Sequence, residues 1–270
     1  MNRSNRRDRP SREDHSGTDQ RSDVIYGVSP VLELLRADKR SIDKIAIAEG
    51  IHEKRLSEIF ELARSKGIVV NRVPKNKIKE ITGDAANDQG VVAFAASASY
   101  VSAEEILDDC SDDAMLLVLD GVEDPRNLGA ILRTAECSGV DGVFIPERRS
   151  VGLTDTVAKS SAGAAEYVRV AKVANLNRLI EELKERNIWV VGTSAEAEME
   201  YSDWDWSRPT ALVLGGEGRG LHRLVAENCD VLVKIPMYGK IQSLNVSVAA
   251  GVILFEARRQ RLAAKRAREG

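Results

Sequence analysis

The stretch IPMYGKIQSLN, residues 235–245, separates a short apolar run from a longer one. The run before it, Val231–Ile235, is typical of a short buried strand. The run after it, Val246–Phe255, is apolar almost all round and is long enough for a buried helix. Ser243 and Asn245 are both favourable N-cap residues for that helix, although capping needs only one of them. The loop therefore indicates either a site where backbone N–H groups and short side chains meet a ligand, or an ordinary capped core helix.

A second strand, loop and helix follow one another from Leu116. The run Leu116–Asp120 is typical of a buried strand, and an acidic loop comes after it. The spacing i, i+3, i+4, i+7 predicts the core face of the next helix, which carries Leu128, Ile131, Leu132 and Ala135. Asn127 stands where an N-cap is expected, and Arg133 lies off the apolar stripe, within the second turn. Taken alone, Arg133 is best interpreted as a solvated helix position.

A third strand, Ala211–Leu214, runs into a loop in which four glycines surround Glu217. Glycine lets the backbone come close to a ligand. The dinucleotide fingerprint G-x-G-x-x-G does not fit the loop at any starting position, and the chain has no P-loop. On its own this loop is a weak indication of a ligand site.

Together, in this order and spacing, the three segments resemble the motifs of the SpoU (TrmH-like) family of RNA ribose 2′-O-methyltransferases, within the SPOUT superfamily. The matching residues are Asn127, Arg133, Gly215, Glu217, Ile235, Pro236, Ser243, Leu244 and Asn245. The resemblance covers roughly residues 114–260. The region before it is similar to the substrate-binding domain of the bacterial 23S rRNA guanosine 2′-O-methyltransferase branch. Its Asp88-Gln89-Gly90 run stands where that branch usually has His-Gln-Gly.

Alternating strands and helices predict an α/β fold with a mostly parallel sheet and helices on both faces. We divide the chain into a disordered basic tail (1–22), a small α/β RNA substrate-binding domain (23–100), a linker (101–113), a methyltransferase domain (114–260) and a second basic tail (261–270). The resemblance adds two features that patterning does not predict. These are an L30e-like fold for the first domain and a trefoil knot in the C-terminal part of the second.

The resemblance implies an enzyme that moves a methyl group from S-adenosylmethionine to a ribose 2′-hydroxyl of RNA, most directly a guanosine of 23S rRNA. It implies the catalytic residues Asn127, Arg133, Glu217, Ser243 and Asn245, and no metal. It implies the cofactor-binding residues Leu214, Gly215, Gly216, Ile235, Pro236, Ser243 and Leu244. Two roles stay open for Arg133. It is either the base, although a guanidinium is costly to deprotonate, or a cation that stabilises the developing alkoxide.

Composition sets looser limits on the function. The net charge of −3 gives no global sign of nucleic-acid binding, and local patches decide such binding. Three widely spaced cysteines predict a reducing, cytoplasmic location, and no apolar stretch reaches the ~20 residues of a membrane span. The expected partners are RNA and a second copy of the chain as a homodimer, with no membrane and no DNA. The basic tails are either RNA-contacting arms or solvated ends.

Three alternatives to this function stay open. Two belong to the same family: a tRNA ribose methyltransferase, and an rRNA methyltransferase that confers resistance to a ribosome-directed antibiotic. The third is a non-enzymatic RNA-binding protein, because the N-terminal domain and the basic tails would serve that role alone. The complete set of motif residues argues against the third.

Overall fold

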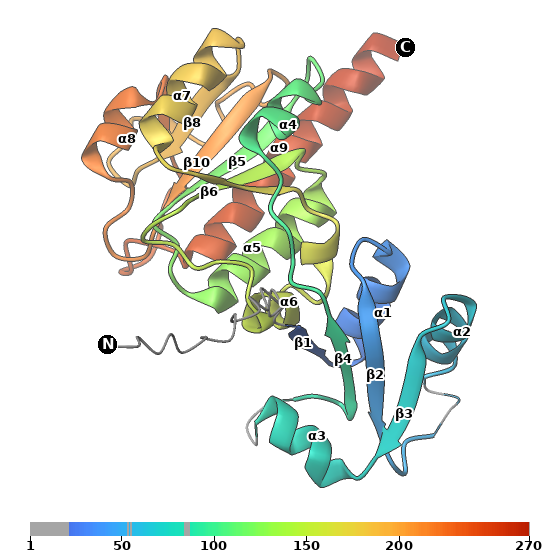
Figure 1. Ribbon diagram of the computed structural model, residues 1–270. Coiled ribbons are helices and arrows are strands. Elements are labelled where there is room, and N and C mark those ends of the chain that lie inside the picture. Colours follow the sequence, from blue (N-terminus) through green and yellow to red (C-terminus); the bar gives the residue numbers. More distant parts are fainter. Residues whose placement is uncertain (1–21, 53, 55, 84–86, 270) are drawn as a thin grey trace, which may run out of the picture.

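The computed structural model describes residues 22–269 except 53, 55 and 84–86, and the chain forms two α/β units joined side by side (Figure 1). The predicted tail at 1–22 therefore lies, apart from Ser22, outside the described residues. The elements of the first unit are β1 (Asp23–Tyr26), α1 (Val28–Ala37), β2 (Ile42–Ala48), α2 (Ser57–Ser65), β3 (Val69–Val73), α3 (Lys75–Thr82) and β4 (Val91–Ala95). They build a sheet of order β1-β4-β2-β3, in which only β2 and β3 are parallel.

The helices of the first unit cover its sheet because their apolar residues recur at helical spacing. Val31, Leu34 and Leu35 of α1 pack with Ile59 of α2 in one cluster that includes alternate residues of β2 and β4. Ile78 of α3 packs in the other cluster, which lies on the opposite face of the same strands.

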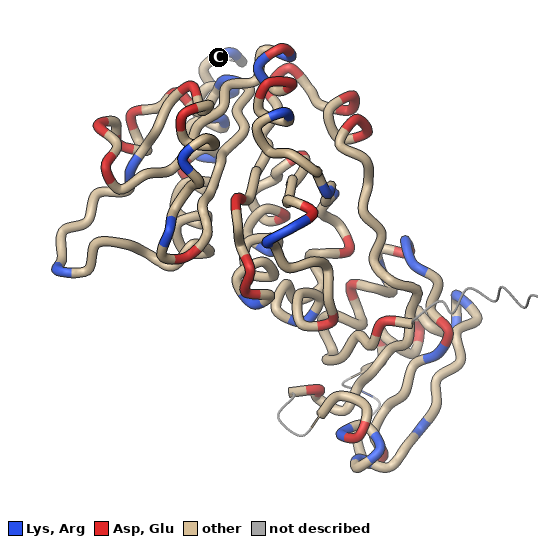
Figure 2. The backbone as a smooth tube through the Cα atoms, turned by 60° about the vertical axis from the view of Figure 1, so that its left-hand side comes forward, with Lys and Arg blue, Asp and Glu red and all other residues tan. Residues whose placement is uncertain are grey.

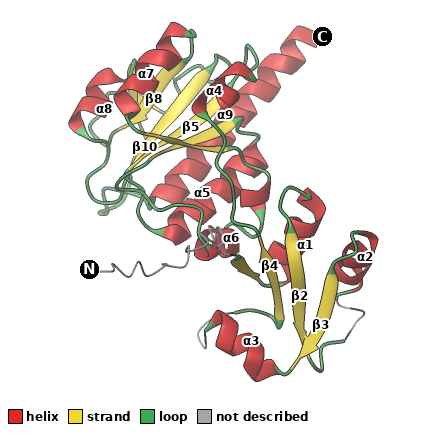
Figure 3. Cartoon of the chain, in the orientation of Figure 1, coloured by secondary structure: helices red, strands yellow, loops and turns green. Residues whose placement is uncertain are grey.

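The second unit holds a seven-stranded sheet (Figure 3). Its elements are β5 (Met115–Asp120), α5 (Pro125–Ser138), β6 (Gly142–Pro146), α6 (Asp155–Ser160), the 3-10 helix η2 (Ala164–Glu166), β7 (Val170–Val173), α7 (Leu176–Glu185), β8 (Trp189–Thr193), β9 (Met199–Glu200), β10 (Thr210–Gly215), α8 (Arg223–Asn228), β11 (Val231–Lys234) and α9 (Val246–Glu269). The strand order is β7-β6-β5-β10-β8-β11-β9, and every pair is parallel. The α/β class with a parallel sheet is thus confirmed.

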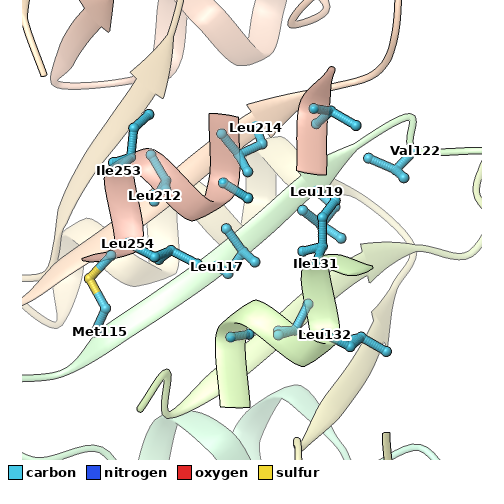
Figure 4. Close-up of a cluster of buried hydrophobic side chains, with 14 of the residues drawn as sticks. Met115, Leu117, Leu119, Val122, Ile131, Leu132, Leu212, Leu214, Ile253 and Leu254 are labelled. Atoms are coloured by element: carbon cyan, nitrogen blue, oxygen red, sulfur yellow. The ribbon is translucent and has the colours of Figure 1, made fainter. Parts of the chain in front are cut away.

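Both faces of this sheet are buried, as β5 shows. Leu117 and Leu119 face the cluster formed by α5 and α9 (Figure 4). Leu116 and Val118 face the cluster formed by α7, α8 and α4 (Ala103–Asp108). The segment 101–113, predicted to be a linker, thus includes a helix whose buried apolar residues pack on the second unit.

The order in which the chain adds strands to the sheet reverses at the β5–β10 pair. The strands β6 and β7 lie on one side of this pair, and β8, β11 and β9 lie on the other. Asp120 and Gly215, the last residues of the two strands, are in register, and the N–H of Gly216 donates to the carbonyl of Asp120 at 2.8 Å. In open α/β sheets, such a switch point opens a crevice at the carboxyl ends of the strands. The loops after β5 and β10 are therefore held next to each other.

The last helix differs from expectation in two respects. It runs without a break across the boundary predicted at 260, and Arg261 binds the carbonyl oxygens of Ala114, Trp206 and Arg208 at 2.8–3.0 Å. Arg261 therefore holds α9 against the start of β5 instead of reaching into solvent. Within one chain the apolar run Val246–Phe255 is not covered all round, because Val248 and Phe255 have exposed fractions of 49% and 51%.

A buried ion pair joins the two units. Nη1 of Arg40 lies 2.9 Å from Glu166 of η2, and the exposed fractions of the two side chains are 6% and 5%. Arg40 also pairs with Asp23 at 2.7 Å and donates to the carbonyl of Ala96. Burial raises the pKa of Glu166, and the Arg40 charge opposes that shift. A second link runs from Lys159 of α6 to the carbonyl of Asn87 at 2.6 Å.

We expect Arg40→Met to lower the free energy of unfolding by ~3–5 kcal/mol at neutral pH, because it leaves the Glu166 carboxylate buried without its cation. The loss should shrink as the pH falls. Burial raises the pKa of Glu166 in the folded chain, so at low pH Glu166 takes up a proton and is neutral without Arg40. Urea unfolding at pH 5 and pH 8 measures both effects. Arg36→Met, which breaks exposed pairs with Glu33 and Glu58, is the matched control and should cost far less. Equal losses for the two variants would contradict the role of the buried pair.

Candidate active site

Two cavities open at the carboxyl ends of β5 and β10. The first, the β10–β11 cavity, has a volume of about 780 Å³ and lies between the loops that follow β8, β10 and β11. The second, the β5 cleft, has a volume of about 800 Å³ and lies between the loops that follow β5 and β10. Gly216, Glu217, Arg219, Gly220 and Val246 line both of them. The two cavities therefore share one wall, which the glycine-rich loop and the start of α9 provide.

Three side chains from the three sequence motifs meet at this wall. Nδ2 of Asn245 donates to Oε1 of Glu217 at 2.9 Å and lies 3.0 Å from Oδ1 of Asn127. Nδ2 of Asn127 donates to the same Glu217 oxygen. The Glu217 carboxylate thus accepts from two amides that belong to two different helices. Residues 127, 217 and 245, which are far apart in the chain, form one hydrogen-bonded cluster.

Each of the two asparagines is positioned by the start of a helix. Oδ1 of Asn245 accepts from the N–H of Ser247 at 2.9 Å, which confirms that Asn245 caps α9. The N-cap position predicted for Asn127 is wrong. Asp124 caps α5, with its Oδ1 accepting from the N–H of Arg126 at 2.7 Å, and Pro125 occupies the first helical position. Asn127 therefore lies inside the first turn, where its side chain is 8% exposed and is free to bind Glu217.

Two glycines at the end of β10 are required by close backbone contacts. A Cβ on Gly215 would lie 2.1 Å from the carbonyl carbon of Gly220, and a Cβ on Gly216 would lie 2.2 Å from the carbonyl oxygen of Gly121. Any side chain at either position would push the loop out of place. The loop around Glu217 is therefore held tightly between β5 and its own return at Gly220.

Most of the predicted cofactor-binding residues line the β10–β11 cavity, namely Leu214, Gly215, Gly216, Ile235, Ser243 and Leu244. Pro236 does not line it, although Ile235 and Met237 on either side do. The sequence interpretation missed the segment Thr193–Glu196, which also lines the cavity. A signal for it existed, because it directly follows a parallel strand, β8, and ligands bind beyond the carboxyl ends of such strands.

The structure does not bring Arg133 to this cluster. Arg133 is exposed on α5 and lines neither cavity, and it lies six residues beyond Asn127, or about 9 Å along the helix axis. Ser243 lines the β10–β11 cavity but makes no hydrogen bond within the Asn127–Glu217–Asn245 cluster. One chain therefore supplies only part of the predicted catalytic set.

His222 is a second polar feature of the β5 cleft. Its backbone N–H donates to Oδ2 of Asp120 at 2.7 Å, and its Nδ1 lies 2.8 Å from Oδ1 of the same carboxylate. The Asp120 side chain is only 5% exposed, so it holds the imidazole in one orientation.

Nearby, burial raises the pKa of the Cys229 thiol to about 12, which excludes Cys229 as a thiolate nucleophile at neutral pH.

The chemistry of the β10–β11 cavity suits a ligand of cofactor size. Its volume lies in the range of small-molecule sites, and it combines apolar walls such as Leu214, Val233 and Ile235 with glycine backbone and short polar groups. Together with the adjoining cleft, this arrangement can hold two ligands, one on either side of a shared wall.

Comparisons with known proteins define the class. The profile of the SpoU rRNA Methylase family matches residues 114–255, and that of the RNA 2′-O ribose methyltransferase substrate-binding domain matches residues 24–101. The chain therefore belongs to the SpoU methylase family, and the resemblance seen in the sequence is confirmed.

Individual relatives agree with this assignment. The chain is 45% identical over 246 residues to YacO of Bacillus subtilis, which is placed in the TrmH family of tRNA/rRNA methyltransferases; the match covers 90% of this chain and 97% of YacO. It is also 45% identical over 242 residues to the 23S rRNA (guanosine-2′-O-)-methyltransferase RlmB of Ralstonia nicotianae, covering 89% and 97%. The AdoMet-bound rRNA methyltransferase from Sinorhizobium meliloti superposes with a TM-score of 0.73 at 27% identity, covering 88% of this chain and 87% of that one.

The protein is thus an RNA methyltransferase that uses S-adenosylmethionine as its methyl donor. The β10–β11 cavity fits this cofactor by size, and at Gly218 and Gly220 in its lining an added Cβ would meet nothing within 4 Å. The β10–β11 cavity is thus the candidate donor site, and the β5 cleft is the candidate acceptor site.

We expect Gly215→Ala to lower the affinity for S-adenosylmethionine at least tenfold, because the added Cβ displaces the loop at Gly220 that lines the cavity. Gly239→Ala is the matched control. A Cβ on Gly239 meets nothing within 4 Å, and we expect no more than a twofold change. Isothermal titration calorimetry on the full chain without RNA measures both affinities. Unchanged binding by Gly215→Ala would contradict the assignment of this cavity to the donor.

Proposed function

We propose that the protein methylates the 2′-hydroxyl of a guanosine in 23S rRNA, as a step of rRNA processing. The observation that carries this proposal is the Asn127–Glu217–Asn245 cluster, which lies in the wall between the cofactor-sized cavity and the β5 cleft. A methyl acceptor in the cleft and a donor in the cavity would meet at the edge of this cluster, because the transfer needs direct contact between the acceptor oxygen and the methyl carbon. The donor supplies an electrophilic methyl group on a positively charged sulfur.

The three clustered side chains act chiefly by positioning. Their mutual hydrogen bonds leave little freedom of movement, and a correctly aligned in-line attack lowers a barrier by ~7–11 kcal/mol in favourable cases. The Glu217 carboxylate also places negative charge next to the donor cavity, which suits a cationic donor. In this proposal Ser243 and Leu244 bind the donor, and Asn127, Glu217 and Asn245 orient the acceptor and donor.

We further propose that Arg133 acts across a homodimer. Arg133 is exposed on α5, which packs against α9 of the same chain. On α9 the exposed residues Val248, Phe255 and Leu262 recur every seven positions, so they share one face of the helix. A second copy of the chain covering this face would bury the apolar stripe and bring its own Arg133 to the partner's acceptor cleft. Of the two roles considered for Arg133, electrostatic stabilisation of the developing alkoxide needs no deprotonated guanidinium.

A trefoil knot belongs to the same proposal. The strand β11 lies between β8 and β9, both of which precede it in the chain. Residues 194–198 connect β8 to β9 and so cross from one side of β11 to the other, and the N–H of Ser194 donates to the carbonyl of Val233 in β11. This path supports threading of the segment after β11 through the loop that residues 194–198 help to form.

We likewise propose that the first unit is L30e-like and acts as the RNA-binding domain, which its match to the substrate-binding profile supports.

The target RNA is the least constrained part of the proposal. A relative at 45% identity is named as an enzyme acting on 23S rRNA, whereas YacO is described with tRNA and rRNA together. We favour 23S rRNA because rRNA stands in both descriptions and the first of them specifies 23S rRNA. Mapping 2′-O-methylation in rRNA and tRNA from a deletion strain, restored with the wild-type gene or with Asn245→Ala, decides between them. A mark that is lost from tRNA alone would overturn the rRNA assignment.

We propose a cytoplasmic location. The described cysteines Cys110, Cys137 and Cys229 are all free thiols, as expected in a reducing compartment. Among the described residues no helix has both the length and the apolar character needed to cross a bilayer.

We expect Arg133→Ala to lower kcat at least 100-fold while the affinity for S-adenosylmethionine changes less than threefold, because Arg133 does not line the donor cavity. Asn245→Ala should also abolish transfer, through loss of the cluster. Mixing the two variants should restore part of the activity, since hybrid dimers hold one site with both residues intact. Methyl transfer from labelled donor measures this rescue. Full activity of a chain that stays monomeric at micromolar concentration would remove the shared site.

A further inference from the structure

The β5 cleft is acidic for a site that must accept RNA. Its lining carries four carboxylates, those of Asp120, Glu123, Asp124 and Glu217, against the two guanidiniums of Arg149 and Arg219. A polyanionic strand gains affinity mainly from cations placed near its phosphates. The cleft is therefore suited to a ribose and its base, and the phosphates on either side need positive charge outside it.

A third cavity next to the cleft provides that charge. It has a volume of about 460 Å³ and shares Asp120, Gly121, Arg149 and His222 with the cleft, so the two adjoin each other. Its balance of charge is reversed, with three guanidiniums, those of Arg148, Arg149 and Arg223, against the single carboxylate of Asp120. Asp120 already accepts from the backbone and ring of His222. Positive charge thus dominates this cavity.

The basic side chains stand on fixed backbone. Arg148 and Arg149 lie in the turn after β6, where the hydroxyl of Ser150 donates to the carbonyl of Pro146. The N–H of Glu147 donates to the carbonyl of Val173 at 3.0 Å, which ties this turn to β7. Within the described part of the chain, Arg148 and Arg149 make no ion pair, whereas Arg223 has an exposed pair with Glu227 at 2.6 Å. Two guanidiniums are therefore available to a ligand without loss of an existing contact.

His222 lies between the two spaces. Asp120 engages Nδ1 of its ring, which leaves Nε2 as the ring nitrogen open to a ligand. The side chain is 47% exposed and belongs to the lining of both the cleft and the third cavity. A nucleotide chain that runs from the cleft into the third cavity would pass this ring.

We propose that the third cavity is a phosphate subsite, which holds the RNA strand next to the methylated nucleotide through Arg148 and Arg149. The inference rests on the proposed function and extends it to the path of the substrate. The ligand in this proposal is the backbone of a single-stranded RNA segment, because guanidiniums bind phosphate oxygens in a bidentate geometry and two of them stand beside the acceptor cleft. The subsite adds affinity and register for the acceptor, and it takes no part in the transfer step.

The test compares Arg148→Gln/Arg149→Gln with Arg178→Gln. Arg178 is exposed on α7, which begins beside the same cavity, but it does not line that cavity. The control therefore removes a positive charge nearby without removing the subsite. For the double variant we expect a rise in KM for RNA of about tenfold or more at physiological salt, with kcat at saturating RNA and donor affinity unchanged. The slope of log affinity against log salt should fall by about 1.4, the share of two phosphate contacts on a single strand. The control should stay within twofold of wild type.

Shortened RNA substrates identify the ligand. When the strand on one side of the target nucleotide is removed, the difference between wild type and double variant should vanish for that substrate and persist for RNA trimmed on the other side. A difference that persists with both trimmed substrates would show that no flanking strand occupies the cavity. An unchanged KM and salt slope in the double variant would overturn the subsite while wild-type transfer still stands. Absence of methyl transfer to any RNA by the wild type would instead overturn the proposed function.

Discussion

The parallel pairing of β5 with β10 is the constraint on which the site depends. It sets Asp120 beside Gly215, so the loops that follow these two residues start next to each other. The next N–H, that of Gly216, donates back to Asp120, and the absence of side chains at Gly215 and Gly216 lets the loop return at Gly220. Glu217, in the loop after β10, is thereby presented to Asn127 in the first turn of α5. Hydrogen bonds within the site are thus a consequence of strand register, and a change in that register would separate the partners.

The core explains why the register is stable. Residues of β5 and β10 alternate between two apolar clusters, one under α5 and α9 (Figure 4) and the other under α4, α7 and α8. A slip by one residue would exchange these faces for every side chain of a strand. Because α5 carries Asn127 and α9 begins at the cap Asn245, the same cluster that fixes the sheet also aims two of the three clustered side chains. The packing of the core and the geometry of the side-chain cluster are therefore set by the same contacts.

The three motifs and the parallel sheet could be predicted because they leave local signals: apolar runs, glycines and capping residues at fixed offsets. The N-cap at Asp124 also had a local signal, which the interpretation missed: Pro125 favours the first helical position and so makes the residue before it the cap. Other features have no local signal. Arg261 lies in a basic run, yet its partners are carbonyl groups more than 50 residues away in sequence. Arg133 lies outside both cavities of its own chain. In our proposal it acts in the site of a second chain, and no sequence pattern within one chain indicates such a shared site.

The balance of charge relates the architecture to RNA. The chain has 39 Lys and Arg against 42 Asp and Glu, and these residues are interspersed over both units (Figure 2). A protein without a strong overall positive field gains little from non-specific attraction to RNA, which any polyanion would share. Affinity must then come from a few cations at fixed positions, and these report whether a strand follows the correct path. In our proposal the acidic cleft disfavours phosphates at the position of the acceptor hydroxyl, and the guanidiniums of the adjoining cavity attract them to that cavity. Such an arrangement favours register over affinity, which suits an enzyme that must select one ribose along a uniform backbone.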